Sequence, residues 1–234
     1  LVGGAGDDTY YVDARFDDVV ELPGEGYDTV YASSSFTLSA NVEKLVLSEG
    51  GDWTAGGNSL DNWLVGNSGN NVLSGGIGKD TLEGGLGNDI YVLSDGLDTI
   101  IDTGGIDTIR SSLDVELPGD IENVELVGIS DVSATGNAAS NRLVGNSGNN
   151  ILDGRGGEDT LTGGGGSDQF IVSWNGSNMK SDVITDFIAG DDLLVIDLAS
   201  FGFRLQDLGV TSSGLVSEGS FLKGAGVTAL DPDD

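Results

Sequence analysis

The 234-residue chain contains 40 glycines, 39 acidic residues and only 9 basic residues, which gives a formal net charge of −30 at pH 7. Such a polyanion repels nucleic acid and anionic membrane surfaces, and it repels itself until cations neutralise it. Histidine and cysteine are absent, which excludes disulfides, thiolate metal sites, serine and cysteine triads and the usual zinc protease sites.

The chain opens on a glycine-rich unit of nine residues, GGAGDDTYY from Gly3, which carries Asp8 at its sixth place. No apolar run reaches membrane-spanning length, and residues 1–4 do not form a signal peptide. We therefore expect no membrane insertion, and we expect the chain to be part of a longer protein.

Residues 12–56 are less regular, with fewer turn glycines and more apolar side chains. The turn from Pro23 to Asp28 is a degenerate head of the same unit, which places Asp28 on the same edge as Asp8. We expect apolar burial to hold these layers together, through Phe36, Leu38, Val42, Leu45 and Leu47.

Residues 57–92 read without a gap as four nine-residue units, GNSLDNWLV, GNSGNNVLS, GGIGKDTLE and GGLGNDIYV. Each unit begins with glycine, has Asp or Asn at its sixth place and has a large apolar residue at its eighth place. A flexible glycine-rich linker is the alternative, but linkers do not repeat large apolar residues at every eighth place.

This spacing has a physical meaning for metal binding. Glycines let the backbone turn through positive φ, and they leave carbonyl oxygens free to point at one spot. The sixth-place side chain adds a further oxygen there, and calcium takes six to eight such oxygens. One turn supplies about half a coordination shell, so an equivalent turn must stack on it, and a solenoid is required. The short strand that follows turns only its eighth-place residue into the core.

The unit Gly75 to Glu83, GGIGKDTLE, resembles the RTX nonapeptide GGxGxDxUx. The resemblance implies an all-β fold, namely a parallel β-roll or right-handed β-solenoid with calcium bound in the turns. It also implies a calcium-binding module of a bacterial extracellular protein that passes through a type I secretion channel unfolded and folds on external calcium.

A second copy follows the first. Residues 136–171 read as GNAASNRLV, GNSGNNILD, GRGGEDTLT and GGGGSDQFI, and segments of the first half return 79 positions later, as Asn41-Val42-Glu43 does in Asp120-Ile121-Glu122. In residues 93–135, counting nines from Gly84 gives unit starts at Leu93 and Asp102. We expect one continuous roll over residues 1–172 with two units per layer. Two globular domains joined by a linker are the alternative.

Residues 173–234 follow a different pattern. The segments SDVITDF from Ser181 and DDLLVIDL from Asp191 resemble those that follow the repeats in serralysin-type metalloproteases and alginate epimerase modules. In those families this region caps the open end of the roll, and a cap is physically needed because the last layer would otherwise expose strand edges. We therefore predict a small β-rich C-terminal cap over residues 173–234.

Several residues are candidate calcium ligands. Sixth-place residues two units apart stack on one edge, and each such pair is predicted to share an ion, completed by backbone carbonyls of the glycine-rich heads. Asp182 and Asp186 are a terminal site by resemblance, with plain solvation as the alternative. The predicted metal-binding residues are Asp8, Asp28, Asn62, Asn71, Gly75, Ile77, Gly78, Asp80, Gly84, Leu86, Gly87, Asp89, Asp98, Asp107, Asn141, Asn150, Gly154, Gly156, Gly157, Asp159, Gly163, Gly165, Gly166, Asp168 and Asp182.

Two features complicate this assignment. The sixth-place asparagines have an alternative role as a ladder that only hydrogen-bonds turn to turn. Arg155 occupies a second place that is usually glycine, where a left-handed backbone strains a non-glycine residue. We predict no catalytic site in this chain. The alternatives are an accessory module of an extracellular protease, lipase or epimerase, and a polysaccharide-binding or cell-surface module that uses Trp63 and Trp53.

Overall fold

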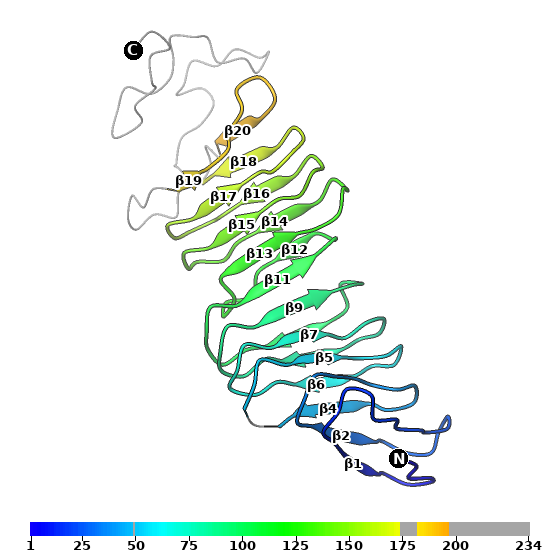
Figure 1. Cartoon of the computed structure of the whole chain (residues 1–234). Coiled ribbons are helices and arrows are strands. Elements are labelled where there is room, and N and C mark those ends of the chain that lie inside the picture. The colour runs from blue at the N-terminus through cyan, green and yellow to red at the C-terminus, as the bar shows by residue number, and fades with distance from the viewer. Residues whose placement is uncertain (49, 174–181, 197–234) are drawn as a thin grey trace, which may run out of the picture.

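The computed structural model describes residues 1–48, 50–173 and 182–196, and every regular element within them is a β-strand. The strands stack in parallel and form a long rod with the N-terminus at one end (Figure 1). In the regular coils each strand pairs with the strand 18 residues further on, as Trp63 does with Thr81 and Val72 with Ile90. Two nine-residue units therefore complete one turn, and the predicted parallel solenoid is confirmed.

From β2 onward, successive strands alternate between the two flanks of the coil. One flank begins with a six-stranded sheet that contains, in order, β1 (Thr9–Val12), β2 (Thr29–Ala32), β4 (Lys44–Leu47), β6 (Trp63–Val65), β8 (Thr81–Glu83) and β10 (Thr99–Ile101). The same flank continues as a five-stranded sheet of β12 (Val115–Glu116), β14 (Ser133–Thr135), β16 (Ile151–Asp153), β18 (Gln169–Val172) and β20 (Leu193–Ile196).

The opposite flank carries one nine-stranded sheet. Its strands are β3 (Phe36–Thr37), β5 (Thr54–Gly56), β7 (Val72–Ser74), β9 (Ile90–Leu93), β11 (Thr108–Ser111), β13 (Asn123–Leu126), β15 (Arg142–Val144), β17 (Thr160–Thr162) and β19 (Val183–Ile184). This sheet runs without a break from the first half of the chain into the second.

A single apolar core fills the space between the flanks. The strands are short, and alternate residues point inward, so each regular unit contributes one large side chain. The eighth-place residues Leu64, Leu73, Leu82 and Tyr91 are all completely buried. The apolar residues predicted to hold the first irregular passage are buried as well, namely Phe36, Leu38, Val42, Leu45 and Leu47. Their counterparts 79 positions later are also buried, at Leu117, Ile121, Val124 and Leu126.

The 79-residue repeat of the sequence is not a whole number of turns. Equivalent strands β6 and β15 begin 79 residues apart, at Trp63 and Arg142, and are nine strands apart in chain order. An odd number of steps between alternating flanks places them on opposite flanks, with β6 in the six-stranded sheet and β15 in the nine-stranded sheet. The second copy is therefore displaced from the first by half a turn.

Each copy contains one short coil of 15 residues, in which Thr29 pairs with Lys44 or Thr108 pairs with Asn123. A sheet begins at the two-residue strand inside each short coil, at β3 in the first copy and at β12 in the second. The sheet edges thus fall at equivalent positions, so the short coil belongs to the duplicated unit.

Strands β19 and β20 add one further coil, in which Val183 pairs with Thr160 and Leu193 pairs with Gln169. Both strands lie in the segment predicted to cap the roll. Residues 174–181 and 197–234, which hold most of that segment, lie outside the described residues. The division of the chain between residues 172 and 173 therefore stays a prediction.

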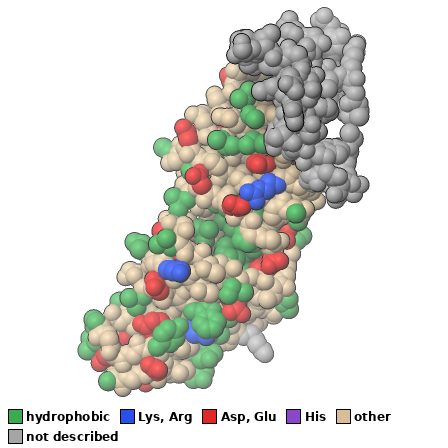
Figure 2. Space-filling view, turned by 180° about the vertical axis from the view of Figure 1, so that it is seen from behind, with side chains coloured by type: hydrophobic (Ala, Val, Ile, Leu, Met, Phe, Trp, Pro, Cys, Tyr) green, Lys and Arg blue, Asp and Glu red, His purple; other side chains and the backbone are tan. Residues whose placement is uncertain are grey.

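The outside of the rod is acidic. Figure 2 shows carboxylates distributed along one face, with few basic side chains among them. In the part of the chain that the structure describes, no helix has the length and apolar character needed to cross a membrane.

Candidate calcium sites

The turns between strands stack along the two edges of the roll, and their sixth-place residues form columns. In each column a carboxylate Oδ1 accepts a hydrogen bond from the backbone N–H of the sixth-place residue one coil earlier. The structure brings together all six predicted pairs, with N···O distances of 2.7 to 3.1 Å in Asn62–Asp80, Asn71–Asp89, Asp80–Asp98, Asp89–Asp107, Asn141–Asp159 and Asn150–Asp168.

The columns extend beyond the regular units. The Asp8 N–H donates to Asp28 Oδ1 at 2.8 Å, and the Asp159 N–H donates to Asp182 Oδ1 at 3.1 Å, so Asp28 and Asp182 lie where a shared site was predicted. Two glutamates, Glu43 and Glu122, were missed; each accepts the next N–H of a column at 2.8 Å. The signal that could have found them is their recurrence 79 positions apart.

Four turns end in aspartate, and we call them the aspartate turns: residues 75–80, 84–89, 154–159 and 163–168. All four have positive φ at their second and fourth places, for example +99° at Gly76 and +143° at Gly78. Arg155 also adopts a left-handed conformation, with φ of +61°, so the strain expected there is present.

The first-place glycine of an aspartate turn lies against its carboxylate. A Cβ added to Gly75 would lie 2.0 Å from Asp80 Oδ2, and a Cβ added to Gly57 in the preceding coil would lie 2.1 Å from the Gly75 carbonyl oxygen. Only glycine leaves space for these oxygens, so the glycine pattern follows from close packing of backbone against oxygen atoms.

Six aspartates of the carboxylate columns have a second carboxylate oxygen that is buried without a partner among the described residues. Within the described residues, no hydrogen bond reaches Oδ2 of Asp28, Asp80, Asp89, Asp98, Asp107 or Asp159. An ionised carboxylate can only accept hydrogen bonds, and burying one without compensation is costly. A hard cation such as Ca²⁺ satisfies these oxygens without a donor group.

Burial also shifts the acidity of these groups. Loss of solvation raises the pKa of Asp89 and Asp98 to about 6, and that of Asp107 and Asp159 to about 7. The hydrogen bond from the preceding coil opposes the rise, and neighbouring carboxylates add to it. The same effects raise the pKa of Asp80 and Asp168. A cation in the turns would remove the cause of these shifts by favouring the charged form.

The other four regular turns carry asparagine at their second and sixth places, and we call them the asparagine turns: residues 57–62, 66–71, 136–141 and 145–150. None of them has a residue with positive φ. Two of them carry a side chain at the fourth place, Leu60 and Ala139, whereas a Cβ on Gly69 or Gly148 would lie 2.5 Å from a backbone carbonyl oxygen of the preceding coil. The asparagine turns thus have a different backbone conformation from the aspartate turns.

Hydrogen bonds close each asparagine turn from within. Asn71 Oδ1 accepts from the Asn67 N–H at 2.8 Å, and Asn71 Nδ2 donates to the Gly51 carbonyl of the coil before at 3.2 Å. Asn67 Nδ2 donates to the Ser48 carbonyl, and its Oδ1 accepts from the Gly69 N–H. The same bonding in all four turns favours the hydrogen-bonded ladder over a ligand role for Asn62, Asn71, Asn141 and Asn150.

A third carboxylate joins one of the aspartate pairs. Asp102 lies with Asp89 and Asp107 so that one oxygen from each falls within 4.8 Å of the others, and the Tyr91 hydroxyl donates to Asp102 Oδ1 at 2.7 Å. Sequence reasoning did not assign Asp102 a role. The signal was its position, because counting nines from Gly84 puts it at the first place of a unit.

The tryptophans proposed for sugar binding have other contacts. The Lys44 ammonium lies 3.4 Å from the centre of the Trp63 ring, and Trp63 Nε1 donates to Glu83 at 3.3 Å. Trp53 is partly buried and packs against the core. Although 38% of the Trp63 surface is exposed, the Lys44 ammonium already lies over its ring and Trp53 packs against the core, so the structure does not support that use of Trp63 and Trp53.

The fold and its turns define a class of protein, a parallel β-solenoid whose stacked turns present paired, buried carboxylates. Comparison with known protein families supports the assignment of these turns as calcium-binding. Residues 1–14, 56–91 and 135–170 match the sequence profile of the RTX calcium-binding nonapeptide repeat, and these stretches contain all eight regular turns. The chain therefore carries RTX calcium-binding repeats.

A curated enzyme shares part of this sequence. Over 62 residues the chain is 42% identical to the endo-1,3-1,4-beta-glycanase ExsH of Rhizobium meliloti (strain 1021). The match covers 26% of this chain and 13% of the length of that enzyme. The similarity therefore concerns a small part of the glycanase.

Proposed function

We propose that this chain is the calcium-binding repeat module of a bacterial extracellular protein, and that it folds when it meets calcium outside the cell. The observation that supports this best is the set of buried Oδ2 atoms in the carboxylate columns, which lack partners among the described residues. These acceptors need a cation, whereas the asparagine turns satisfy their own polar groups.

The residues present fit calcium as the bound ion. The sixth-place aspartates would supply carboxylate oxygens from two successive coils. Backbone carbonyls of the glycine-rich heads would supply the rest, at Gly75, Ile77, Gly84, Leu86, Gly163 and Gly165. Calcium accepts this mixture of oxygens in flexible geometry, and its charge would offset the acidic columns.

Calcium binding and folding are coupled because each site needs two coils. An ion that binds only the folded chain stabilises it by mass action, by RT ln(1 + [L]/Kd). At low cytosolic calcium the acidic, glycine-rich chain stays unfolded, which suits passage through a type I secretion channel. Millimolar calcium outside the cell then drives folding.

A calcium titration of the whole chain followed by circular dichroism tests this function. In calcium-free buffer at pH 8 we expect the spectrum of a disordered chain, and calcium addition should produce β signal in a cooperative transition. Magnesium at the same concentration is the control, because Mg²⁺ demands stricter octahedral geometry and dehydrates reluctantly. A β-rich spectrum that is unchanged by calcium would refute the proposal.

The activity of the parent protein is a second question, for which the similarity to a glycanase favours one answer. We infer that the module is an accessory part of a secreted enzyme and is not itself catalytic. Incubation of the calcium-loaded chain with 1,3-1,4-β-glucan should release no reducing sugar, and hydrolysis by this chain alone would contradict the inference.

A further inference from the structure

Glu21 is a buried carboxylate to which the nonapeptide pattern gives no role. It opens the irregular turn that ends at Asp28, and only 5% of its surface is exposed. Neither of its carboxylate oxygens has a hydrogen-bond partner in the part of the chain that the structure describes. Burying a charged group in this way is costly unless an opposite charge accompanies it.

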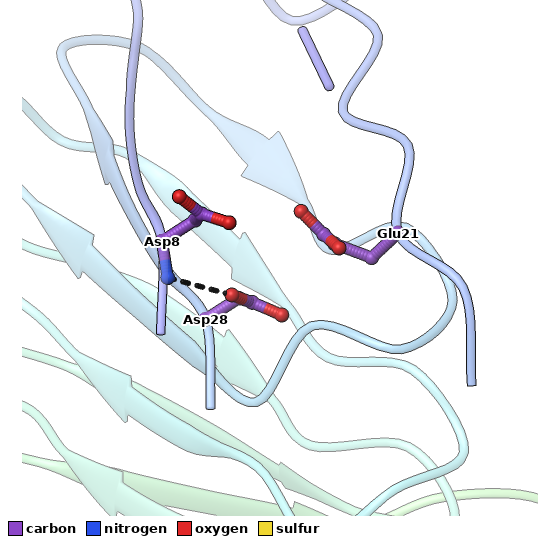
Figure 3. Close-up of side chains that lie close together, drawn as sticks. All are labelled: Asp8, Glu21 and Asp28. Carbon is purple, nitrogen blue, oxygen red and sulfur yellow. Dashed lines mark hydrogen bonds between the residues drawn. The ribbon is translucent and has the colours of Figure 1, made fainter. Parts of the chain in front are cut away.

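Glu21 points at two other carboxylates. Figure 3 shows its side chain directed toward Asp8, which ends the turn one coil earlier, and toward Asp28, which ends the same turn as Glu21. One oxygen from each of the three residues lies within 4.8 Å of the others. Asp28 is completely buried, and its Oδ2 also lacks a partner among the described residues. The ion pairs Arg110–Glu125 and Arg155–Glu116 lie in other coils.

The spacing of these oxygens matches a single calcium ion. Calcium binds oxygen at 2.3 to 2.6 Å, so two oxygens on one ion lie at most about 5 Å apart. An ion among the three carboxylates could therefore contact all of them at once. The donor atoms are all carboxylate oxygens, which favours a hard cation over zinc or copper.

The same arrangement occurs a second time, where Asp102 joins Asp89 and Asp107. In both places the extra carboxylate opens the turn one coil after a unit with glycine, aspartate and tyrosine at its first, sixth and eighth places. A Cβ on the glycine would lie within 2.3 Å of the tyrosine hydroxyl in both cases, for Gly3 with Tyr10 and Gly84 with Tyr91. A group of three carboxylates thus occurs at two places in the roll, with the Tyr91 hydroxyl donating to Asp102 and the Tyr10 hydroxyl without a partner among the described residues.

We propose that Asp8, Glu21 and Asp28 form a three-carboxylate calcium site, in which Glu21 adds to the aspartate pair supplied by two stacked turns. The proposal rests on the proposed function in that calcium is the ion. Affinity rises with the charge of the ligands, so removing the Glu21 charge should weaken this site by roughly tenfold or more.

Counting bound calcium tests the proposal. The whole chain is titrated with calcium alone in a calorimeter, as wild type, Glu21→Gln, Asp18→Asn and Asp80→Asn. Asp18 is exposed in the same irregular coil, so Asp18→Asn removes an equal charge nearby without touching the site. Glu21→Gln should lose one tightly bound ion or weaken one by at least tenfold, and Asp18→Asn should match wild type.

The outcomes separate this site from the general function. If Glu21→Gln binds calcium as Asp18→Asn does, while Asp80→Asn loses an ion, the three-carboxylate site is wrong and the calcium-binding function stands. If wild type binds no calcium, both fall.

A measurement on wild type covers the case in which Glu21→Gln does not fold. Crystals grown with terbium, which replaces calcium on oxygen ligands, should show an anomalous peak among Asp8, Glu21 and Asp28. Peaks at the aspartate turns with no peak at these three residues would overturn the proposal.

Discussion

The asparagine turns and the aspartate turns have the same length, the same leading glycine and the same place in the coil. They differ in how their buried side-chain polar atoms find partners. An asparagine carries both a donor and an acceptor, so Asn71 can bond the Asn67 N–H and the Gly51 carbonyl together. An aspartate carries only acceptors, so Asp89 satisfies one oxygen with the Asn71 N–H and leaves the other without a partner among the described residues.

The difference shows that turns of one repeat can be stabilised in two ways, by hydrogen bonds or by a bound ion. The asparagine turns depend on hydrogen bonds between protein groups, which need no ion once the coils are stacked. The aspartate turns depend on an ion that the chain does not contain. Because each aspartate turn of a block stacks on an asparagine turn, we infer that the hydrogen-bonded turns form a base on which the calcium-dependent turns assemble.

A change of pH should have the largest effect on stability, because several aspartates titrate together whereas asparagine does not titrate. In calcium-free buffer, burial raises the pKa of Asp89, Asp98, Asp107 and Asp159 in the folded state to about 6 to 7, from an ordinary aspartate pKa of 3.8. The folded state therefore holds protons that the unfolded state releases. Stability should be fully present below pH 3.8 and lost as the pH rises through 6 to 7.

Thermal melts of calcium-free protein between pH 4 and 8 measure this dependence. Saturating calcium should reverse its sign, because the ion needs deprotonated ligands. Melts in high salt are the control, since salt screens repulsion between exposed charges but has little effect on buried carboxylates. Stability that rises with pH in the absence of calcium would contradict the assignment.

Replacing one aspartate should have the next largest effect. Asp89→Ala removes a ligand from a column that also contains Asn71 and Asp107, and the calcium midpoint of folding should rise on the order of a hundredfold. The midpoint is read by circular dichroism. Asp18→Ala is the matched control, because Asp18 is exposed and lies outside the carboxylate columns; equal shifts in the two variants would be evidence against a special role for Asp89.

Replacing one asparagine should lower the free energy of unfolding by an amount that does not depend on the calcium concentration. Asn71→Ala leaves the Asn67 N–H and the Gly51 carbonyl without their bonds, which should lower the free energy of unfolding by about 2 kcal/mol. Urea denaturation at two saturating calcium concentrations should give the same loss. Ser68→Ala is the control because Ser68 is exposed in the same turn. A loss that disappears as calcium rises would instead make Asn71 a calcium ligand.

The smallest effect concerns the one aspartate turn without glycine at its second place. Arg155→Gly relieves a left-handed residue, which should raise the free energy of unfolding by up to about 1 kcal/mol. The variant also loses the ion pair with Glu116, but both side chains are largely exposed, so that loss is small. Glu116→Gln measures it separately, and a destabilised Arg155→Gly would show that the arginine has a further role.

Much of this structure could be predicted because the nine-residue period determines which residues are buried, how many units form a layer and which turns stack. It identified the buried Leu64 and Tyr91, the two-unit layer and the stacking of Asp80 on Asn62. It could not distinguish the roles of Asn71 and Asp89, because both provide a side-chain oxygen and only the backbone geometry shows which donors lie nearby. Glu21 was missed for another reason, since two extra residues before Asp28 remove it from the count of nine.

The half-turn displacement between the two copies has a consequence for the shape of longer rods. The 15-residue coil of each copy uses less chain than its neighbours and so shortens the circumference on one side. Successive copies are related by a screw motion through half a turn, so the next copy shortens the circumference on the opposite flank. Any curvature of the rod caused by one short coil is therefore offset by the next. We expect a rod built from more copies of this 79-residue unit to be straight. Equivalent turns and strands of successive copies would lie alternately on the two flanks.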